Sequence, residues 1–333
     1  MPTKNPTLPL IRLAHPMAFM AFLHHIGAPV DRHLRRHGLP VLCNDPDVFV
    51  PLPRVWSFFD TAAHHEDPMV GWLTGAYVGD HNLNSSLLRK LETAPTLLQA
   101  LRELARMARV EASDIHLGIH ERQEDILFYT FYSNLRQVPG YMISQAYQLG
   151  VILGLIRYFL GRHWVPHEIG IEDSVAPSIA EEHFPGSRIL TQQQTGYIAI
   201  PRSCLHRAAC RTVLTDCGAG VAVPSQSFNY IDTLRAVLRA YLPDGYPTAR
   251  FAAKLMSTSE RTLTRRLAAH GVTYGALIDD VRFTMAKENL QNPDVRIVDV
   301  ALSVGFNDQG DFTRMFRRVG GLTPREYRTA TQS

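Results

Sequence analysis

The N-terminal part of the chain has the apolar spacing of helices. Met17, Met20 and Ala21 recur at helical intervals, and Gly27 then provides a stop signal. A second apolar stripe follows Pro95, a residue favoured in the first turn of a helix. The members of this stripe are Leu97, Leu98, Leu101, Leu104, Ala105 and Ala108. We therefore expect residues 1–110 to be mostly helical.

The pattern then changes to alternation. Ile115, Leu117 and Ile119 alternate with histidine and glycine, and residues 126–132 are rich in aromatic and β-branched side chains, so two strands of a hairpin are predicted. Helical spacing returns at 141–160, and short strands are expected between 164 and 200. Four aromatic residues of the second strand either line an effector cavity or, as packing favours, fill the core: Phe128, Tyr129, Phe131 and Tyr132.

An uncharged segment separates this part from a different one. Residues 218–227 read GAGVAVPSQS, and glycine, proline and serine without charge are typical of a linker. We divide the chain into an N-terminal domain at 10–217, a linker at 218–228 and a C-terminal domain at 229–333. The predicted fold class is an α+β N-terminal domain, helix-rich with a small antiparallel sheet, followed by an all-α C-terminal domain.

The C-terminal domain contains an imperfect internal repeat. Segments 253–257 and 301–305 correspond to each other, 48 residues apart. In each segment a small residue precedes an apolar one by three positions, a turn residue follows, and an amphipathic helix comes next. The small residue lets two helices approach and the turn redirects the chain, which is the packing arrangement of a helix-turn-helix. The two units are predicted near 248–267 and 296–319.

The second helix of each unit leaves polar side chains exposed. In the first unit Ser259 can cap the helix while Leu263 and Leu267 face inward, and in the second unit the apolar stripe is Phe312, Met315, Phe316 and Val319. Residues 273–290 predict one long helix that would hold the two units at a fixed distance. If that distance is roughly 34 Å, about one turn of DNA, both units enter the same face of a duplex.

Charge distribution adds to this interpretation. Apolar residues make up 45% of the chain and charged residues 20%, as in soluble globular proteins. Residues 229–333 contain 15 lysines and arginines against 11 acidic residues, whereas the rest has 19 against 20. A basic excess at one end is a nucleic-acid signal, and arginine suits both guanine edges and phosphates.

The closing segment resembles the AraC/XylS family of transcription regulators. It reads GFNDQGDFTRMFRRVGGLTPREYR, close to that family's signature, and the similarity extends over the whole C-terminal domain. The resemblance implies double-stranded promoter or operator DNA as the partner. It implies base reading by Arg261, Thr264, Arg265, Gln309, Asp311, Thr313 and Arg314, and phosphate contacts by Ser259, Arg266, Arg317 and Arg318.

Two positions depart from the family's pattern. Gly310 stands where the family often has a polar side chain, so one base contact is expected to be missing. Ser257 stands where the first turn usually has glycine, so that turn is expected to be strained. Asp311 cannot pair with phosphate; it either accepts from a cytosine amino group or serves the N-terminus of its own helix.

The N-terminal domain is similar to the helix-rich "arabinose-binding type" sensor domain of the subgroup that contains ornithine-utilisation regulators. The matching features are Glu66-Asp67-Pro68, the helix after Pro95, Trp164-Val165-Pro166 and Phe184-Pro185-Gly186. The resemblance implies a small-molecule effector with unassigned binding residues, a homodimer, RNA polymerase as a partner, and activation rather than repression. The alternative is a constitutive or protein-partner-controlled DNA binder whose N-terminal domain only dimerises.

Several other functions are disfavoured by the sequence. No apolar run long enough to span a membrane appears, and no secretion signal, so a cytoplasmic protein is expected. Four cysteines form no metal-ligand pattern, and His33 and His37 lack a third ligand, so we expect no metal and no cofactor. Cys204 lacks the sequence context of an alkyl-acceptor repair protein, and no catalytic motif is present, so an enzyme is not expected.

Overall fold

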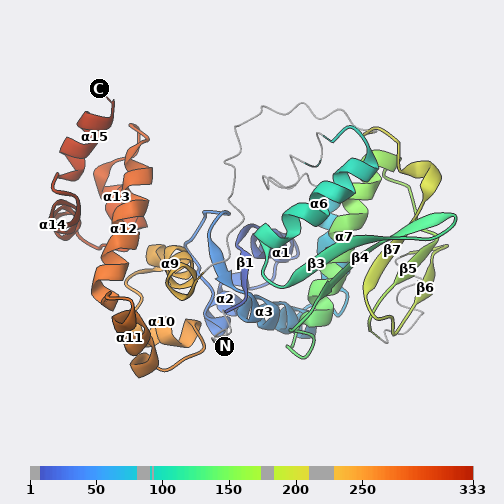
Figure 1. Ribbon diagram of the computed structural model, residues 1–333, viewed down its shortest axis with the longest axis horizontal. Helices are drawn as coiled ribbons and strands as arrows, with labels where there is room; N and C mark the ends of the chain where they lie inside the picture. Colours follow the sequence, from blue (N-terminus) through green and yellow to red (C-terminus); the bar gives the residue numbers. More distant parts are fainter. Residues whose placement is uncertain (1–7, 81–90, 92–93, 174–183, 210–228, 333) are drawn as a thin grey trace. The chain divides into compact units, whose positions relative to one another are not determined.

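The computed structural model describes residues 8–80, 91, 94–173, 184–209 and 229–332 (Figure 1). The chain forms two compact units, which are treated separately below. Unit 1 contains Met1–Leu13, Leu34–Pro51 and Ser227–Ser333, and unit 2 contains Ala14–His33 and Leu52–Gln226. The predicted linker at 218–228 lies outside the described residues, as do Cys210 and Cys217.

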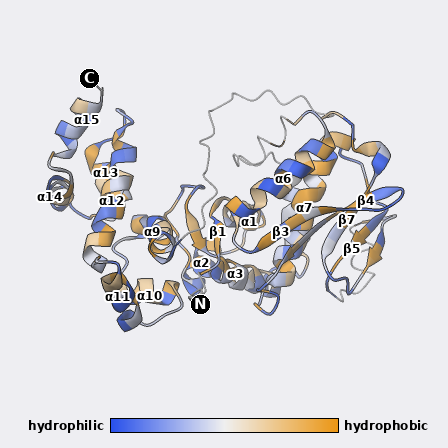
Figure 2. Ribbon diagram, in the orientation of Figure 1, coloured by the Kyte–Doolittle hydropathy of each residue, from blue (hydrophilic) through white to orange (hydrophobic). Residues whose placement is uncertain are grey.

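Unit 2 is rich in helices, as predicted. They are α1 (Ala14–His25), α3 (Leu52–His65), α4 (Val70–Asp80), α6 (Leu97–Glu111) and α7 (Tyr141–Leu160), while α2 (Val30–His37) is divided between the units. The side chain of Thr96 caps α6 by accepting from the backbone N–H of Gln99. Leu97, Leu101 and Leu104 of its predicted stripe are buried. Figure 2 shows hydrophobic and hydrophilic residues mixed along this amphipathic helix.

A five-stranded sheet lies against these helices. Its strands are β3 (Ile115–Glu121), β4 (Asp125–Tyr132), β5 (Glu168–Gly170), β6 (Arg188–Leu190) and β7 (Gly196–Pro201), in the order β3-β4-β7-β5-β6. All pairs are antiparallel except the edge pair β5–β6, which is parallel. The predicted hairpin is therefore confirmed as β3–β4, and the sheet has one parallel edge that the alternation did not reveal.

Strand β4 separates its aromatic side chains between two faces. Phe128 is fully buried in the core with Leu149 and Ile152 of α7, and Tyr132 packs edge-on against Trp56 at a ring-centroid distance of 4.7 Å. Tyr129 lies on the opposite face, since successive strand residues point to opposite sides. For Phe128 and Tyr132, core packing is the arrangement observed.

Helices α4 and α7 pack closely together in unit 2. A Cβ atom added at Gly75 would lie 2.6 Å from the Cα of Gly150 and 2.8 Å from the carbonyl oxygen of Tyr147. Among the described residues, α7 is also the one helix long and apolar enough to cross a membrane by composition. Since 56% of its apolar window is buried inside the protein, it has the surroundings of a core helix.

The C-terminal part of unit 1 is all-helical, as predicted. Its elements are α9 (Tyr230–Tyr241), the 3-10 turn η2 (Leu242–Asp244), α10 (Ala249–Leu255), α11 (Glu260–Ala269), α12 (Tyr274–Leu290), α13 (Ile297–Ser303), α14 (Gln309–Gly320) and α15 (Pro324–Gln332). One core joins them, with Leu234, Leu263 and Phe312 fully buried. The long helix expected between the two repeats is α12, which Thr273 caps.

Unit 1 also contains segments from the N-terminus. Strands β1 (Leu10–Arg12) and β2 (Phe49–Pro51) pair antiparallel, in a region that was expected to be mostly helical. The Asp244 carboxylate accepts the backbone N–H groups of Val41 and Leu42 at 2.9 and 2.7 Å. The predicted N-terminal domain, 10–217, includes these segments; in the structure they group with residues 227–333.

Two cysteines are described, and both are free thiols. Cys43 is buried in unit 1, and Cys204 is half-buried in unit 2. Burial raises the pKa of the Cys43 thiol to about 11, so it stays protonated at neutral pH. Among the described residues, no group of three histidine, cysteine or acidic side chains is placed to hold a metal ion.

Candidate nucleic-acid interface

The first helix-turn-helix unit consists of α10 and α11. Ser257 in the turn has a φ of 51°, the left-handed conformation that favours glycine, which confirms the strain expected from its side chain. The hydroxyl of Ser259 then accepts from the backbone N–H of Thr262 and caps α11. Leu263 and Leu267 are buried, as predicted. The cap and these two leucines fix the rotation of α11 on the core.

This rotation exposes the side chains predicted to read bases. Arg261, Thr264 and Arg265 are all exposed on α11. The Thr264 hydroxyl donates to the Glu260 carbonyl at 2.9 Å, so its oxygen lone pairs and methyl group remain for an external contact. Arg261 and Arg265 lie four positions apart and therefore share one face of the helix.

The second unit consists of α13 and α14. Its turn contains Gly305 with a φ of 79°, and a Cβ there would lie 2.5 Å from the Leu242 carbonyl oxygen, so only glycine fits. Arg282 of α12 donates to the Gly305 carbonyl oxygen at 2.8 Å. The Asp308 carboxylate caps α14 by accepting from the backbone N–H of Asp311 at 2.9 Å. Through Arg282, helix α12 therefore stabilises the turn that sets the direction of α14.

Most of the predicted readers on α14 are exposed. Gln309, Asp311 and Arg314 are exposed and Thr313 is half-buried, with its hydroxyl donating to the Gln309 carbonyl. Asp311 forms an ion pair with Arg314, three positions away. Of the two roles considered for Asp311, its place in the first turn of α14 agrees with service to the helix N-terminus, and the carboxylate also pairs with a neighbouring arginine.

One member of the predicted apolar stripe of α14 is not in the core. Phe312, Met315 and Phe316 are buried, but Val319 is 39% exposed. The stripe prediction was wrong at this position, because α14 ends one residue later, at Gly320. The last turn projects beyond the buried part of the helix.

The four predicted phosphate contacts differ in their surroundings. Arg317 is exposed, and Ser259 caps α11. The guanidinium of Arg266 lies 4.7 Å from the centre of the Tyr230 ring, which gives it a partner inside unit 1. Arg318 forms an ion pair of 2.7 Å with Asp279 of α12. Two of the three arginines therefore already have internal partners, which sequence spacing did not reveal.

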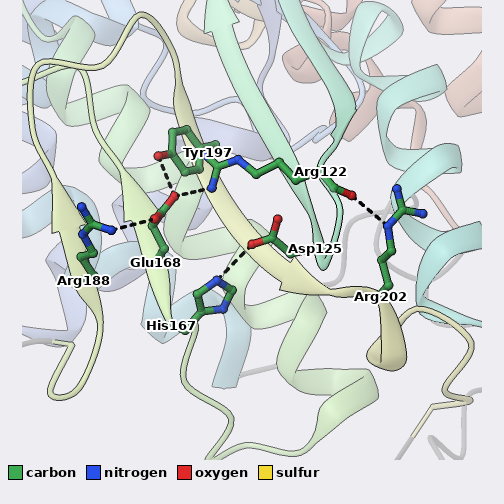
Figure 3. Close-up of polar contacts among 7 residues, drawn as sticks. All are labelled: Arg122, Asp125, His167, Glu168, Arg188, Tyr197 and Arg202. Atoms are coloured by element: carbon green, nitrogen blue, oxygen red, sulfur yellow. Dashed lines mark hydrogen bonds and ion pairs between the residues drawn. The ribbon is translucent and has the colours of Figure 1, made fainter.

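The outer face of the sheet in unit 2 has a polar cluster that sequence analysis missed (Figure 3). Glu168 of β5, only 7% exposed, accepts from Arg122 at 2.8 Å and from the Tyr197 hydroxyl at 3.0 Å. Arg188 lies 3.9 Å from the same carboxylate, and His167 contacts Asp125 at 3.1 Å. The available signal was one charged residue inside an otherwise apolar strand pattern.

Glu168 is expected to make the stability of unit 2 depend on pH. Burial raises the pKa of its carboxyl, but hydrogen bonds from Arg122 and Tyr197 outweigh burial and hold that pKa below the usual 4.5. A lowered folded-state pKa stabilises the fold above the unfolded value, and this stabilisation is lost as the pH falls through the folded value.

We therefore expect stability to fall more steeply with acidification below 4.5 in the parent chain than in Glu168→Gln, which cannot titrate there. Urea unfolding monitored by tryptophan fluorescence reports on unit 2, since all three tryptophans, Trp56, Trp72 and Trp164, lie in it. Parallel pH curves for the two chains would show that Glu168 contributes nothing to this dependence.

Comparison with known proteins decides the family. A model described as the arabinose-binding domain of AraC transcription regulators, N-terminal, matches residues 27–208, more than half of the chain. The chain belongs to the AraC family of transcription regulators. A helix-turn-helix domain model matches residues 252–330, which begin within α10 and include α11, α13 and α14. The resemblance inferred from the closing segment is therefore confirmed.

The relatives of this AraC-family chain include an ornithine utilization regulator from Pseudomonas aeruginosa, 32% identical over 134 residues that cover 40% of this chain and 39% of that protein. The regulator VirS from Mycobacterium tuberculosis is 37% identical over 90 residues, covering 27% of this chain and 26% of that protein. The chain thus matches well under half the length of each relative. Both are transcription regulators, in agreement with the expectation that this chain is not an enzyme.

Among solved structures, the regulator CdpR from Pseudomonas aeruginosa aligns over 95% of this chain and 98% of its own. The identity is 18% and the TM-score 0.40.

Proposed function

We propose that this AraC-family chain binds double-stranded promoter or operator DNA in a sequence-specific manner and thereby regulates transcription. The observation that carries the proposal is the pair of capped helices α11 and α14, each exposing arginines and small polar side chains. Both belong to unit 1 and are joined by the continuous helix α12. Two recognition helices joined by one continuous helix can each contact the same DNA duplex.

Effector control is the second part of the proposal. A small molecule binds unit 2 and shifts the population of DNA-binding states, which requires different affinities for the two states. The match to the arabinose-binding domain model supports a sensing role. Segment Leu34–Pro51 belongs to unit 1 although both of its ends continue into unit 2, so the chain has a covalent route between the units besides the linker.

The remaining parts of the proposal rest on family membership. We propose activation rather than repression, a homodimer, contact with RNA polymerase, and a cytoplasmic location. The alternative is a DNA binder whose N-terminal domain only dimerises. An effector that binds only the folded protein raises the melting temperature, whereas the alternative requires no such ligand.

Replacing Arg265 or Arg314 with alanine tests the base-reading assignment. Each substitution is expected to weaken specific binding by about 1–3 kcal/mol and to relax base preference at one position of the recognised site. The measurement is selection of bound duplexes from random DNA by the full chain, at stated salt because phosphate contacts make affinity salt-dependent.

Arg325→Ala is the matched control, since Arg325 is an exposed arginine on α15, outside both helix-turn-helix units. It is expected to leave the selected sequence unchanged. If Arg265→Ala and Arg314→Ala weaken binding equally on all sequences, these arginines are phosphate contacts instead. If the parent chain selects no sequence with or without candidate effectors, specific DNA binding is refuted.

A further inference from the structure

An open groove lies beside α14, between it and α12. Its volume is about 470 Å³. It is lined by Asp279, Arg282, Phe306, Asp311, Arg314, Met315 and Arg318. Three arginines and two aspartates leave one excess positive charge in it, so the groove favours an anion over a cation.

The positive charge of the groove is anchored by a buried arginine. Arg282 is only 6% exposed, with its guanidinium 4.1 Å from the centre of the Phe306 ring and 4.9 Å from that of Tyr246. Its Nη2 donates to the Gly305 carbonyl, but its Nε has no hydrogen-bond partner among the described residues. Among the residues that the structure describes, no carboxylate lies within ion-pair distance of Arg282. Burial accordingly lowers its pKa.

The exposed edge of the groove is occupied by an internal ion pair. Arg318 of α14 contacts the Asp279 carboxylate at 2.7 Å, and the two side chains are 64% and 20% exposed. Asp279 belongs to α12, outside the helix-turn-helix units, and contributes nothing that donates to DNA. Its charge holds Arg318 and repels any anion that approaches the same guanidinium.

We propose that this groove receives one phosphate of the DNA backbone. Arg318 exchanges Asp279 for the phosphate, and Arg282 supplies a fixed positive charge beneath it. The inference rests on the proposed DNA binding and assigns Asp279 a role there: by competing for Arg318, it lowers affinity for DNA of every sequence. The affinity falls because the Arg318–Asp279 ion pair must be broken before Arg318 can contact the phosphate.

The position of Arg318 favours phosphate over a base edge. Recognition helices reach bases mainly with their N-terminal residues, and Arg318 lies in the last turn of α14. The Arg318 guanidinium points to α12 rather than away from the core, since its partner Asp279 lies there. A contact of this kind sets position and affinity but carries no sequence information.

Asp279→Asn tests the proposal, with Asp280→Asn as the matched control. Both changes remove one negative charge from α12, but Asp280 pairs with Arg235 of α9 instead of Arg318. Binding of the full chain to a labelled random-sequence duplex is measured by fluorescence anisotropy over a potassium chloride series. We expect Asp279→Asn to bind several-fold more tightly, with the slope of log affinity against log salt nearly unchanged, because Arg318 contacts the same phosphate in both chains. Asp280→Asn is expected to change the affinity much less.

Arg318→Ala completes the experiment. It is expected to make the salt plot shallower by about 0.9, and Asp279→Asn is expected to have no further effect in that background. Equal effects of Asp279→Asn and Asp280→Asn, or an Asp279→Asn gain that persists without Arg318, overturn the proposal. If the parent chain shows no salt-dependent binding to duplex DNA at all, the proposed function itself fails, which is a different result.

Discussion

Phe312→Ala is expected to lower the free energy of unfolding of unit 1 by about 3–5 kcal/mol. Phe312 is fully buried at the base of α14, with its ring centre 5.8 Å from those of both Phe306 and Phe316. Alanine removes the ring and leaves a cavity under the second recognition helix. Because this core also fixes the rotation of α14, specific DNA binding is expected to be lost in the same variant.

The two units allow a clean measurement of this effect. Unit 1 contains no tryptophan, so urea unfolding by circular dichroism reports on both units while tryptophan fluorescence reports on unit 2 alone. We expect Phe312→Ala to shift the dichroism curve and to leave the fluorescence curve in place. Val319→Ala on the same helix is the control, because Val319 is 39% exposed, and its expected effect is about 0.5 kcal/mol or less. A small effect of Phe312→Ala would mean that α14 repacks without its ring.

Gly75→Val is expected to destabilise unit 2 by about 3 kcal/mol or more, and Gly75→Ala by about 1–3 kcal/mol. The atoms that a new Cβ would meet are the Cα of Gly150 at 2.6 Å and the carbonyl oxygen of Tyr147 at 2.8 Å. Both are backbone atoms of α7, so they cannot move away as a side chain can. Helices α4 and α7 must separate, and the core that α7 shares with the sheet opens with them.

In both Gly75 variants the tryptophan-fluorescence unfolding curve is expected to shift, since Gly75 lies in unit 2. Gly275→Ala in α12 is the matched control, because a Cβ at Gly275 meets nothing within 4 Å. There the same substitution replaces glycine in an open helical position and is expected to stabilise unit 1 by up to about 1 kcal/mol. If Gly75→Ala were neutral, α4 and α7 would not be held at the separation described above.

The helix-turn-helix units show how much of the interface the sequence predicts. The Ser259 cap, the buried Leu263 and the buried Phe312 all follow from signals a few residues apart, and each is confirmed. Ser257 was expected to be strained from its position in the turn, and its φ is positive. Such features are local, because caps, helical stripes and turns depend on neighbouring residues alone.

Pairings between distant residues were not predictable in this way. Arg318 and Asp279 are separated by 39 positions, and Arg266 meets Tyr230 from another helix. The sequence identified these arginines as cations near a DNA-binding helix, but their partners follow from the angle at which the helices cross. The grouping of Leu34–Pro51 with the C-terminal helices has the same origin, since the backbone of Val41 and Leu42 bonds to the distant Asp244.

The sequence by itself therefore determined the family, the helical C-terminal domain and most of the side chains that α11 and α14 expose. These features follow from helical spacing, capping residues and the family signature, all of which involve residues close together in the sequence. Only the tertiary structure decided which exposed arginines are already paired, and it alone revealed the buried Glu168 cluster and the groove above Arg282. Electrostatic contacts depend on the distance between charges in space, and the spacing of hydrophobic residues along the chain does not predict that distance.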